Sequence, residues 1–325
     1  MFTIAFRSAF VLSTISLSSV AWCAADSKEI APNDPDFLVQ GEYLGEINKP
    51  DGKQQLGVQV IALGKGQFHA VAYKGGLPGN GWDKSDKREC DGETANGVTA
   101  FKDGEFTAKI KNGTLVVAAE GGVMVGELQK VSRQSATLDA KPPEGAIVLF
   151  DGKSADPFES GKMTDDGLLM QGATSKQKFQ SGTLHIEFQL PFEPEKRGQH
   201  RGNSGCYIQG RYEVQMLDSF GLRENNNECG GVYQVKAPDL NMCYPPLAWQ
   251  TYDIDFTAAE FKDGTKEQNA RMKVRHNGVV IHEDLELPGA TAGNVLPEGA
   301  EAGPIFLQDH RSPVRFRNIW FVEKK

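Results

Sequence analysis

The feature that most constrains the fold is a two-residue alternation of apolar and polar side chains, repeated in several segments. In residues 183–190 the apolar members are Leu184, Ile186, Phe188 and Leu190. Residues 252–256 and 270–274 alternate in the same way. No segment sustains the 3.6-residue period of an amphipathic helix. One-faced strands bury their apolar sides most simply in two packed antiparallel sheets, so the second half predicts a β-sandwich.

Turn residues support a mainly β chain. Asn112-Gly113 and Asn277-Gly278 each stand between two β-favouring runs, which is a hairpin signal. The chain also holds 36 glycines and 16 prolines. This composition suits many short strands joined by tight turns better than a helical bundle.

The chain divides into two predicted units. Residues 26–135 form a smaller β-rich domain, with strands expected over 56–63 and 67–73, and no motif in it names a function. Residues 136–145 contain paired prolines and are predicted to be an extended, semi-rigid linker. Residues 146–325 form the sandwich.

The first 25 residues are predicted to be a cleaved signal peptide. Arg7 precedes an apolar stretch over 9–20, and Ala24 and Ala25 follow it. We therefore expect a secreted or periplasmic protein. The apolar stretch is too short to span a bilayer comfortably and no second one occurs, so no transmembrane span is expected. The bulky Trp22 argues against a lipid anchor at Cys23.

Charge and cysteine pattern narrow the function further. The formal net charge is −8 and no basic stripe occurs, which argues against binding to nucleic acid. The four cysteines after the signal peptide form no Cys-x-x-Cys pair, which argues against a zinc ribbon. Cys229 and Cys243 flank one loop and are the candidate disulfide, worth ~3 kcal/mol at that spacing. Cys206 lies in an apolar strand pattern and is read as a buried thiol.

Seven phrases of the second half, taken in order, carry a family resemblance. They are Leu149-Phe-Asp-Gly-Lys153, Gly202-Asn-Ser-Gly205, Tyr212-Glu-Val-Gln-Met-Leu-Asp218, Trp249-Gln-Thr-Tyr-Asp253, His276-Asn-Gly278, Leu307-Gln-Asp-His310 and Arg315-Phe-Arg-Asn-Ile319. Together they resemble the 3-keto-disaccharide hydrolase family, from about Glu144 to the C-terminus. The resemblance implies a concanavalin-like jelly-roll sandwich and an enzyme that acts on an oligosaccharide or glycoside oxidised to a ketone at C3.

Chemistry on such a substrate has clear requirements. A C3 ketone acidifies the C2 proton, so a base can remove it while the charge spreads into an enolate. The C1 aglycone then leaves by elimination, and water can add back to give net hydrolysis. The site therefore needs a base, a group that stabilises the enolate and a proton donor for the leaving oxygen.

Strand alternation selects the candidates. Within 212–217, Glu213 and Gln215 share the face opposite the core-directed side chains. We predict Glu213 as the base and His310 as the second proton-transfer group. The predicted substrate-binding residues are Asn203, Gln215, Tyr233, Trp249, Gln308 and Arg317.

Each candidate has a structural alternative. Glu213 is also compatible with a solvated strand, His310 with a turn before Pro313, and Arg317 with a salt-bridged outer face. Trp249 occurs more often in cores than on sugar platforms.

Two rival functions remain open. Glu213 and Asp218 have the spacing of the outer carboxylates in laminarinase-like glucanases, which makes Asp218 a third catalytic candidate. A two-carboxylate mechanism needs both groups ~5–9.5 Å apart, whereas an odd offset in a regular strand changes face. A non-catalytic carbohydrate-binding module is the second rival.

The sequence does not require a cofactor. A divalent metal is compatible with it, but the six histidines do not have the close spacing of metal ligands.

Overall fold

Strands make up almost all of the regular structure. A computed structural model describes residues 31–85 and 87–324; the predicted signal peptide and Cys23 lie outside them. The helices of this part are η1 (Ala31–Asn33), α2 (Pro35–Val39), η2 (Glu120–Gly122) and η3 (Gly198–His200). None of the helices in the described ranges is long and apolar enough to cross a membrane. The prediction of a mainly β chain is confirmed.

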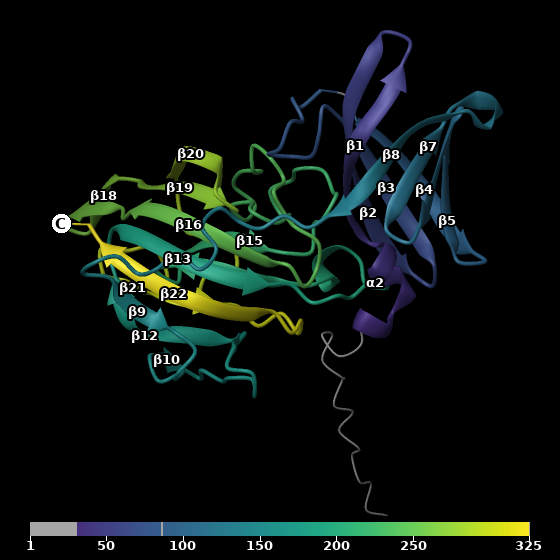
Figure 1. The fold of residues 1–325 in the computed structure, drawn as a ribbon. Helices are drawn as coiled ribbons and strands as arrows, with labels where there is room; N and C mark the ends of the chain where they lie inside the picture. Colours follow the sequence, from purple (N-terminus) through teal and green to yellow (C-terminus); the bar gives the residue numbers. More distant parts are fainter. Residues whose placement is uncertain (1–30, 86, 325) are drawn as a thin grey trace, which may run out of the picture.

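The first eight strands in the described part of the chain form a closed antiparallel barrel. They pair in sequence order, and β8 returns to pair with β1. Figure 1 shows the barrel beside the rest of the chain, with α2 at one end of it. The sequence predicted a β-rich unit here but not its closure. The strands are β1 (Gly41–Lys49), β2 (Gly52–Gly64), β3 (Gln67–Lys74), β4 (Lys87–Ala95), β5 (Val98–Asp103), β6 (Phe106–Lys111), β7 (Thr114–Ala118) and β8 (Met124–Val131).

The remaining strands of the described chain form two large antiparallel sheets and one small one. The five-stranded sheet has the order β10-β12-β21-β14-β15. The seven-stranded sheet has the order β11-β22-β13-β16-β19-β20, with β9 paired to β22, and β17 pairs with β18. The strands are β9 (Ile147–Phe150), β10 (Phe158–Glu159), β11 (Leu169–Met170), β12 (Ala173–Phe179), β13 (Gly182–Gln189), β14 (Ser204–Ile208), β15 (Tyr212–Met216), β16 (Trp249–Thr257), β17 (Glu260–Lys262), β18 (Thr265–Gln268), β19 (Ala270–His276), β20 (Val279–Leu287), β21 (Gly303–Leu307) and β22 (Arg315–Glu323).

The alternating side chains fill the space between the two large sheets. Leu184, Ile186 and Phe188 of β13 are fully buried, and Val214 and Met216 of β15 join the same apolar core. Each large side chain buried in this way contributes ~1.5–3 kcal/mol. The sandwich predicted from the alternation is confirmed.

Two hairpins form where Asn-Gly predicted them. Asn112 and Gly113 join β6 to β7 with φ angles of 51° and 77°. Asn277 and Gly278 join β19 to β20 with φ angles of 52° and 81°. Positive φ at both positions matches the twist of the flanking strands, and Asn and Gly are the residues that accept it most readily.

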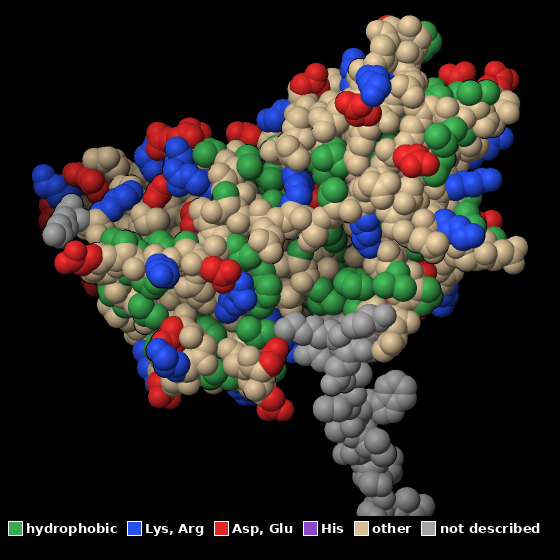
Figure 2. All heavy atoms as spheres, viewed as in Figure 1, with side chains coloured by type: hydrophobic (Ala, Val, Ile, Leu, Met, Phe, Trp, Pro, Cys, Tyr) green, Lys and Arg blue, Asp and Glu red, His purple; other side chains and the backbone are tan. Residues whose placement is uncertain are grey.

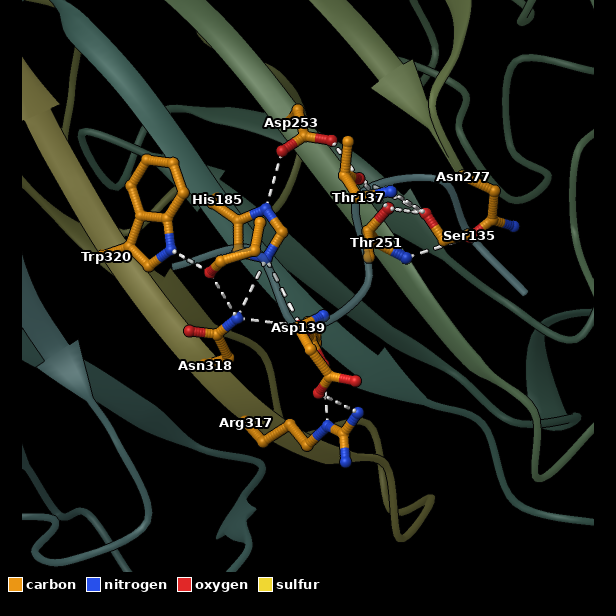
Figure 3. Close-up of polar contacts among 12 residues, drawn as sticks. Ser135, Thr137, Asp139, His185, Thr251, Asp253, Asn277, Arg317, Asn318 and Trp320 are labelled. Carbon is orange, nitrogen blue, oxygen red and sulfur yellow. Dashed lines mark hydrogen bonds and ion pairs between the residues drawn. The ribbon is translucent and has the colours of Figure 1, made fainter. Parts of the chain in front are cut away.

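The connection between barrel and sandwich is not a free spacer. The Ser135 and Thr251 hydroxyls lie 2.6 Å apart, the Thr137 hydroxyl donates to Asp253 (2.6 Å), and the Asp139 backbone N–H donates to Glu187 (2.6 Å). These bonds fix residues 135–139 to the outer face of the seven-stranded sheet (Figure 3). The paired prolines predicted stiffness, but side chains of the sheet hold the segment in place.

Barrel and sandwich also pack directly on each other. Ile61, Val71 and Tyr73 of the barrel belong to the same apolar cluster as the sandwich core. The buried Arg201 donates from Nη1 to the Ala62 carbonyl (3.0 Å). Figure 2 shows acidic and basic side chains interspersed over one face, without a continuous stripe of either sign.

Candidate functional site

The outer face of the five-stranded sheet carries a buried polar cluster. On β15, Tyr212, Val214 and Met216 face the apolar core, so Glu213 and Gln215 point to the other side. Glu213 and Gln215 are nevertheless only 2% exposed each. This face is therefore covered by loops rather than open to solvent.

A hairpin places a tyrosine against Glu213. β14 pairs with β15 so that Tyr207 stands opposite Glu213 and Gly205 opposite Gln215. The Tyr207 hydroxyl donates to Glu213 Oε2 (2.7 Å). Oε1 occupies the space beside Gly205, where a Cβ would lie 2.2 Å from it. Only glycine at position 205 leaves room for this carboxylate.

The environment changes the acidity of Glu213 considerably. Burial raises its pKa from 4.5 to about 7, although the hydrogen bond from Tyr207 acts in the opposite direction. Burial and the nearby Glu213 carboxylate raise the pKa of Tyr207 as well, so Tyr207 remains a donor. A carboxyl group with a pKa near neutrality is suited to general base chemistry at physiological pH.

The loop between β20 and β21 covers the carboxylate. The Thr291 hydroxyl accepts from the Glu213 backbone N–H (2.9 Å). Gly293 packs so closely on the tyrosine that a Cβ there would lie 2.6 Å from the Tyr207 hydroxyl oxygen. Gln308, just after β21, donates from its side chain to the same oxygen (3.3 Å). Tyr207 is therefore held from several sides.

A group of amides extends the polar face beyond Glu213. Gln215 and Asn203 both donate to the Gln199 side-chain oxygen, at 3.2 and 3.3 Å. Gln199 in turn donates to the Asn227 carbonyl (2.9 Å). The side-chain oxygens of Asn203 and Asn227 are buried without a hydrogen-bond partner among the described residues. Buried acceptors of this kind are suited to receive hydroxyl donors of a ligand.

Tyr233 also lies beside this cluster. Its backbone N–H donates to the Glu213 carbonyl (3.1 Å), and its side chain is half-buried. The Tyr233 phenol contributes to the raised pKa of Tyr207, so the two side chains are near each other. The structure thus brings five predicted residues to one face: Asn203, Glu213, Gln215, Tyr233 and Gln308.

Asp218 has a different environment. It lies beyond the end of β15, and its carboxylate forms a buried ion pair with Arg201 (2.5 Å). The same carboxylate accepts from the Phe220 backbone N–H (3.4 Å). These contacts give Asp218 a structural role and engage the carboxylate that a two-carboxylate mechanism would use.

Arg317 and Trp249 belong to the other sheet. Arg317 on β22 pairs with Glu187 (2.7 Å) and Asp139 (3.0 Å), and its guanidinium lies 4.3 Å from the centre of the Trp249 ring. Glu187 is on the outer face of the seven-stranded sheet, where it accepts from the Asp139 backbone N–H of the connection described above. Figure 3 labels Arg317 beside Asp139 on this face. We expected Arg317 and Trp249 to lie beside Glu213, and this was wrong. The alternation of side chains along a strand shows which residues share a face, but it does not show to which of the two sheets the strand belongs. The salt-bridged outer face is the correct alternative for Arg317.

His310 lies in the segment after β21, two residues beyond Gln308, and is exposed. The structure shows no contact between its ring and Glu213 or Tyr207 in the described chain. Its proposed role in proton transfer therefore rests on its position in the sequence and on its exposure.

The predicted disulfide is absent. All four described cysteines, Cys90, Cys206, Cys229 and Cys243, are free thiols. Cys229 and Cys243 are buried and interact with each other. Burial alone would raise the pKa of Cys229, but the interaction with Cys243 lowers it. For Cys243, burial and the interaction with Cys229 both raise the pKa. The loop spacing correctly brought the two residues together but did not determine their redox state. Cys206 is a buried thiol, as expected.

No group of three or more His, Cys, Asp or Glu side chains is arranged to hold a metal ion in the part of the chain that the structure describes. The buried oxygens beside Gln215 belong to amides.

Sequence reasoning missed Tyr207, Gln199 and Asn227 as site residues. Tyr207 carried a usable signal, since Gly205 and Tyr207 alternate just before the strand of Glu213 and a hairpin would align the two strands. Gln199 lies in the three-residue helix η3 and Asn227 lies in a turn, and neither segment has a periodicity that a single sequence reveals.

Comparisons with known proteins show the family of the second half of the chain. Residues 145–322 match the model of the 3-keto-alpha-glucoside-1,2-lyase-like domain. A crystal structure of a candidate glycosyl hydrolase from Parabacteroides distasonis is 36% identical, with a TM-score of 0.52, covering 56% of this chain and 85% of that one. Two further candidate glycosyl hydrolases from the same organism are 17% and 19% identical, with TM-scores of 0.42 and 0.39. They cover 56% and 55% of this chain and 95% and 99% of their own. A comparison with curated proteins gave no match.

Proposed function

Because this chain belongs to the 3-keto-alpha-glucoside-1,2-lyase-like family, we propose that it cleaves 3-keto glycosides with Glu213 as the base. The observation that carries the proposal is the Glu213 carboxylate, buried on the outer face of the sheet with a pKa of about 7. At neutral pH a substantial fraction of this group is ionised and is basic enough to remove a proton made acidic by an adjacent ketone.

The proposed reaction begins at C2. Glu213 takes the C2 proton, and the electrons of the C–H bond form an enolate with the C3 ketone. The enolate then expels the aglycone oxygen from C1, which forms the C1–C2 double bond. Addition of water across this bond gives net hydrolysis, with the free 3-keto sugar as product.

The neighbouring residues have separate roles in the proposal. Tyr207 positions the Glu213 carboxylate through their hydrogen bond (2.7 Å), which also opposes the rise in the Glu213 pKa caused by burial. The buried acceptors of Asn203 and Asn227 receive sugar hydroxyls. His310, exposed beyond Gln308, donates a proton to the leaving oxygen.

Substrate access requires a movement. Glu213 is 2% exposed, and a base must contact the proton that it removes. The Thr291 and Gly293 segment lies directly over Glu213 and Tyr207. We therefore include displacement of the loop between β20 and β21 in the catalytic cycle.

The decisive experiment separates proton abstraction from cleavage. A 3-keto 1,5-anhydroglucitol has the C2 proton but no aglycone, so in D₂O an enzyme of this kind exchanges C2 without cleaving the sugar. We expect exchange with the wild type and at least a hundredfold slower exchange with Glu213→Gln, since general base groups typically contribute 10²–10⁴-fold. Glu187→Gln, which changes a buried glutamate on the other sheet, is the matched control and retains exchange while it remains folded. Undiminished exchange in Glu213→Gln would show that another group is the base.

Leaving-group dependence tests His310. A p-nitrophenolate needs no proton to depart, whereas an alkoxide does. His310→Gln is therefore expected to slow cleavage of alkyl 3-keto glucosides and to leave the p-nitrophenyl compounds nearly unchanged. Equal loss with both aglycones would remove His310 from this role.

Parallel assays on unoxidised glycosides address the rival functions. Cleavage of the plain sugar alone would favour a conventional glucanase, which the Arg201–Asp218 ion pair argues against. Binding of keto sugars without exchange or cleavage would favour a binding module.

The proposal includes export from the cytoplasm, because residues 1–25 have the basic, apolar and small-residue order of a signal peptide. Cell fractionation and sequencing of the mature N-terminus check this, with Asp26 as the expected first residue. Retention of Met1 in the cytoplasmic fraction would contradict export.

A further inference from the structure

The N-terminal barrel contains a cavity of about 290 Å³ that the proposed reaction does not use. The connections after β1, β3, β5 and β7 all lie at one end of the barrel, because the eight strands alternate in direction. Helix α2 closes the other end, where Phe37 packs on Phe192 at 5.2 Å between ring centres (Figure 1). The cavity is near the lower limit of small-molecule sites, and a 150 Å³ cavity already holds benzene.

Small inward residues create this space. Ala70, Ala72 and Ala108 lie on the inward face at positions where larger side chains would fill the barrel, as they do in other small barrels. The remaining wall is mainly apolar and includes Leu56, Phe101 and further residues: Ile47, Val58, Cys90, Phe106, Leu115 and Val117. The lining offers few hydrogen-bonding groups for a sugar and favours a hydrocarbon.

The mouth of the cavity is cationic. Lys49, Lys74 and Arg88 line it, and Asp103 is the carboxylate among its lining residues. Arg88 is paired with Asp103 at 2.5 Å, whereas Lys49 and Lys74 form no ion pair with any described residue. This local excess of positive charge contrasts with the net charge of −8 for the chain.

We propose that the barrel binds a small amphipathic carboxylate, with its hydrocarbon inside the barrel and its acid group between Lys49 and Lys74. Scaling from the benzene-sized cavity, roughly ten to twelve carbons fit. An apolar wall with two unpaired ammonium groups at its rim matches both parts of such a ligand. This site is separate from the Glu213 cluster and does not depend on the proposed reaction.

A series of straight-chain alkanoates tests the hydrocarbon part. Titration calorimetry on the mature protein that begins at Asp26, below the micelle concentration of each acid, is expected to give one site per chain. Affinity should rise by up to about fourfold per added methylene and level off near ten to twelve carbons. Affinity that continues to rise with length, or several weak sites per chain, would show nonspecific surface binding and overturn the proposal.

Head-group variants test the charge. The double variant Lys49→Glu/Lys74→Glu should weaken decanoate about tenfold or more and leave decanol within twofold, since each exposed ion pair contributes only a few-fold. The matched control is Lys109→Glu/Lys111→Glu, which makes the same charge change on exposed outward positions of β6. Equal weakening by both double variants, or equal weakening of acid and alcohol, would refute the assigned head-group site.

Two further measurements locate the hydrocarbon. Ala72→Phe/Ala108→Phe fills the cavity and should abolish decanoate binding. Should that variant not fold, Cys90 of the wild type provides the readout, because it lines the cavity and the other described cysteines are buried. Decanoate should slow alkylation of Cys90 in proportion to occupancy. Unchanged alkylation at saturating decanoate, or full affinity in a folded filled barrel, would place the ligand elsewhere.

Discussion

Removing one hydroxyl group should move the pH dependence of proton abstraction. The relevant change is Tyr207→Phe, because the Tyr207 hydroxyl donates to Glu213 Oε2 (2.7 Å). Burial raises the pKa of Glu213 to about 7, and this hydrogen bond keeps the pKa from rising further. A hydrogen bond to a charged group is worth ~1.5–3 kcal/mol, which corresponds to a further rise in the Glu213 pKa of about one to two.

The sign of the change follows from the role of the base. Glu213 must be ionised to accept a proton, so exchange increases with pH and is half-maximal near pH 7 in the wild type. In Tyr207→Phe the midpoint should lie near pH 8–9. At pH 7 exchange should then be about 5- to 50-fold slower, and the difference should shrink as the pH rises above 9.

The assay is C2 deuterium exchange into 3-keto 1,5-anhydroglucitol from pH 5 to 10, at substrate concentrations below KM. Tyr212→Phe is the matched control, since the Tyr212 phenol donates to Glu298 (2.8 Å) instead of Glu213. Its midpoint should remain near pH 7. A uniform loss of rate in Tyr207→Phe, with no change in midpoint, would refute the assigned role and indicate that the phenol acts in the chemical step itself.

Three further predictions concern stability and packing. Glu213→Gln should stabilise the protein at pH 8 by up to about 3 kcal/mol and have little effect at pH 4. The reason is that a carboxyl group with a raised pKa contributes stability at low pH, and this contribution is lost as the pH rises through about 7. Denaturant unfolding of both proteins at pH 4 and pH 8 checks this. Glu187→Gln should remove up to about 3 kcal/mol at neutral pH, since burial raises the pKa of Glu187 but hydrogen bonds led by His185 lower it to about 2. That contribution is present above pH 4.5 and is lost between about 4.5 and 2, so acid titration of the two proteins should converge below pH 2. Gly205→Ala should reduce C2 exchange at least tenfold while the protein still folds, because the added Cβ would displace Glu213 Oε1. Normal exchange in this variant would mean that the carboxylate can act from another position.

The fold and part of the site were predictable because strands have a two-residue period. Alternation alone put Glu213 and Gln215 on the side away from the apolar core, and Asn-Gly pairs located two hairpins. Periodicity does not show which strands become neighbours. Tyr207 was therefore missed although it stands opposite Glu213, and Arg317 was assigned to a site that lies on the other sheet.

Other features depend on three-dimensional closure. The cavity of the barrel exists because β8 pairs with β1 and encloses inward alanines that are unremarkable in sequence. Residues 136–145 were predicted to be a spacer, yet Asp253 and Glu187, distant in sequence, bind Thr137 and Asp139 within it. Long-range pairings of this kind leave no local pattern.

Burial gives Glu213 its proposed basicity and also blocks its access to substrate. An open carboxylate on this strand would have a pKa near 4.5 and would be a weak base at neutral pH. In the proposed reaction the loops that raise the pKa must therefore open for a sugar and close again over it, so that the C2 proton is removed in the closed state. A substrate that replaces water around Glu213 maintains the raised pKa, whereas a permanently open loop would lower it. Variants that hold the loop open should consequently shift the exchange midpoint to lower pH while reducing the maximal rate.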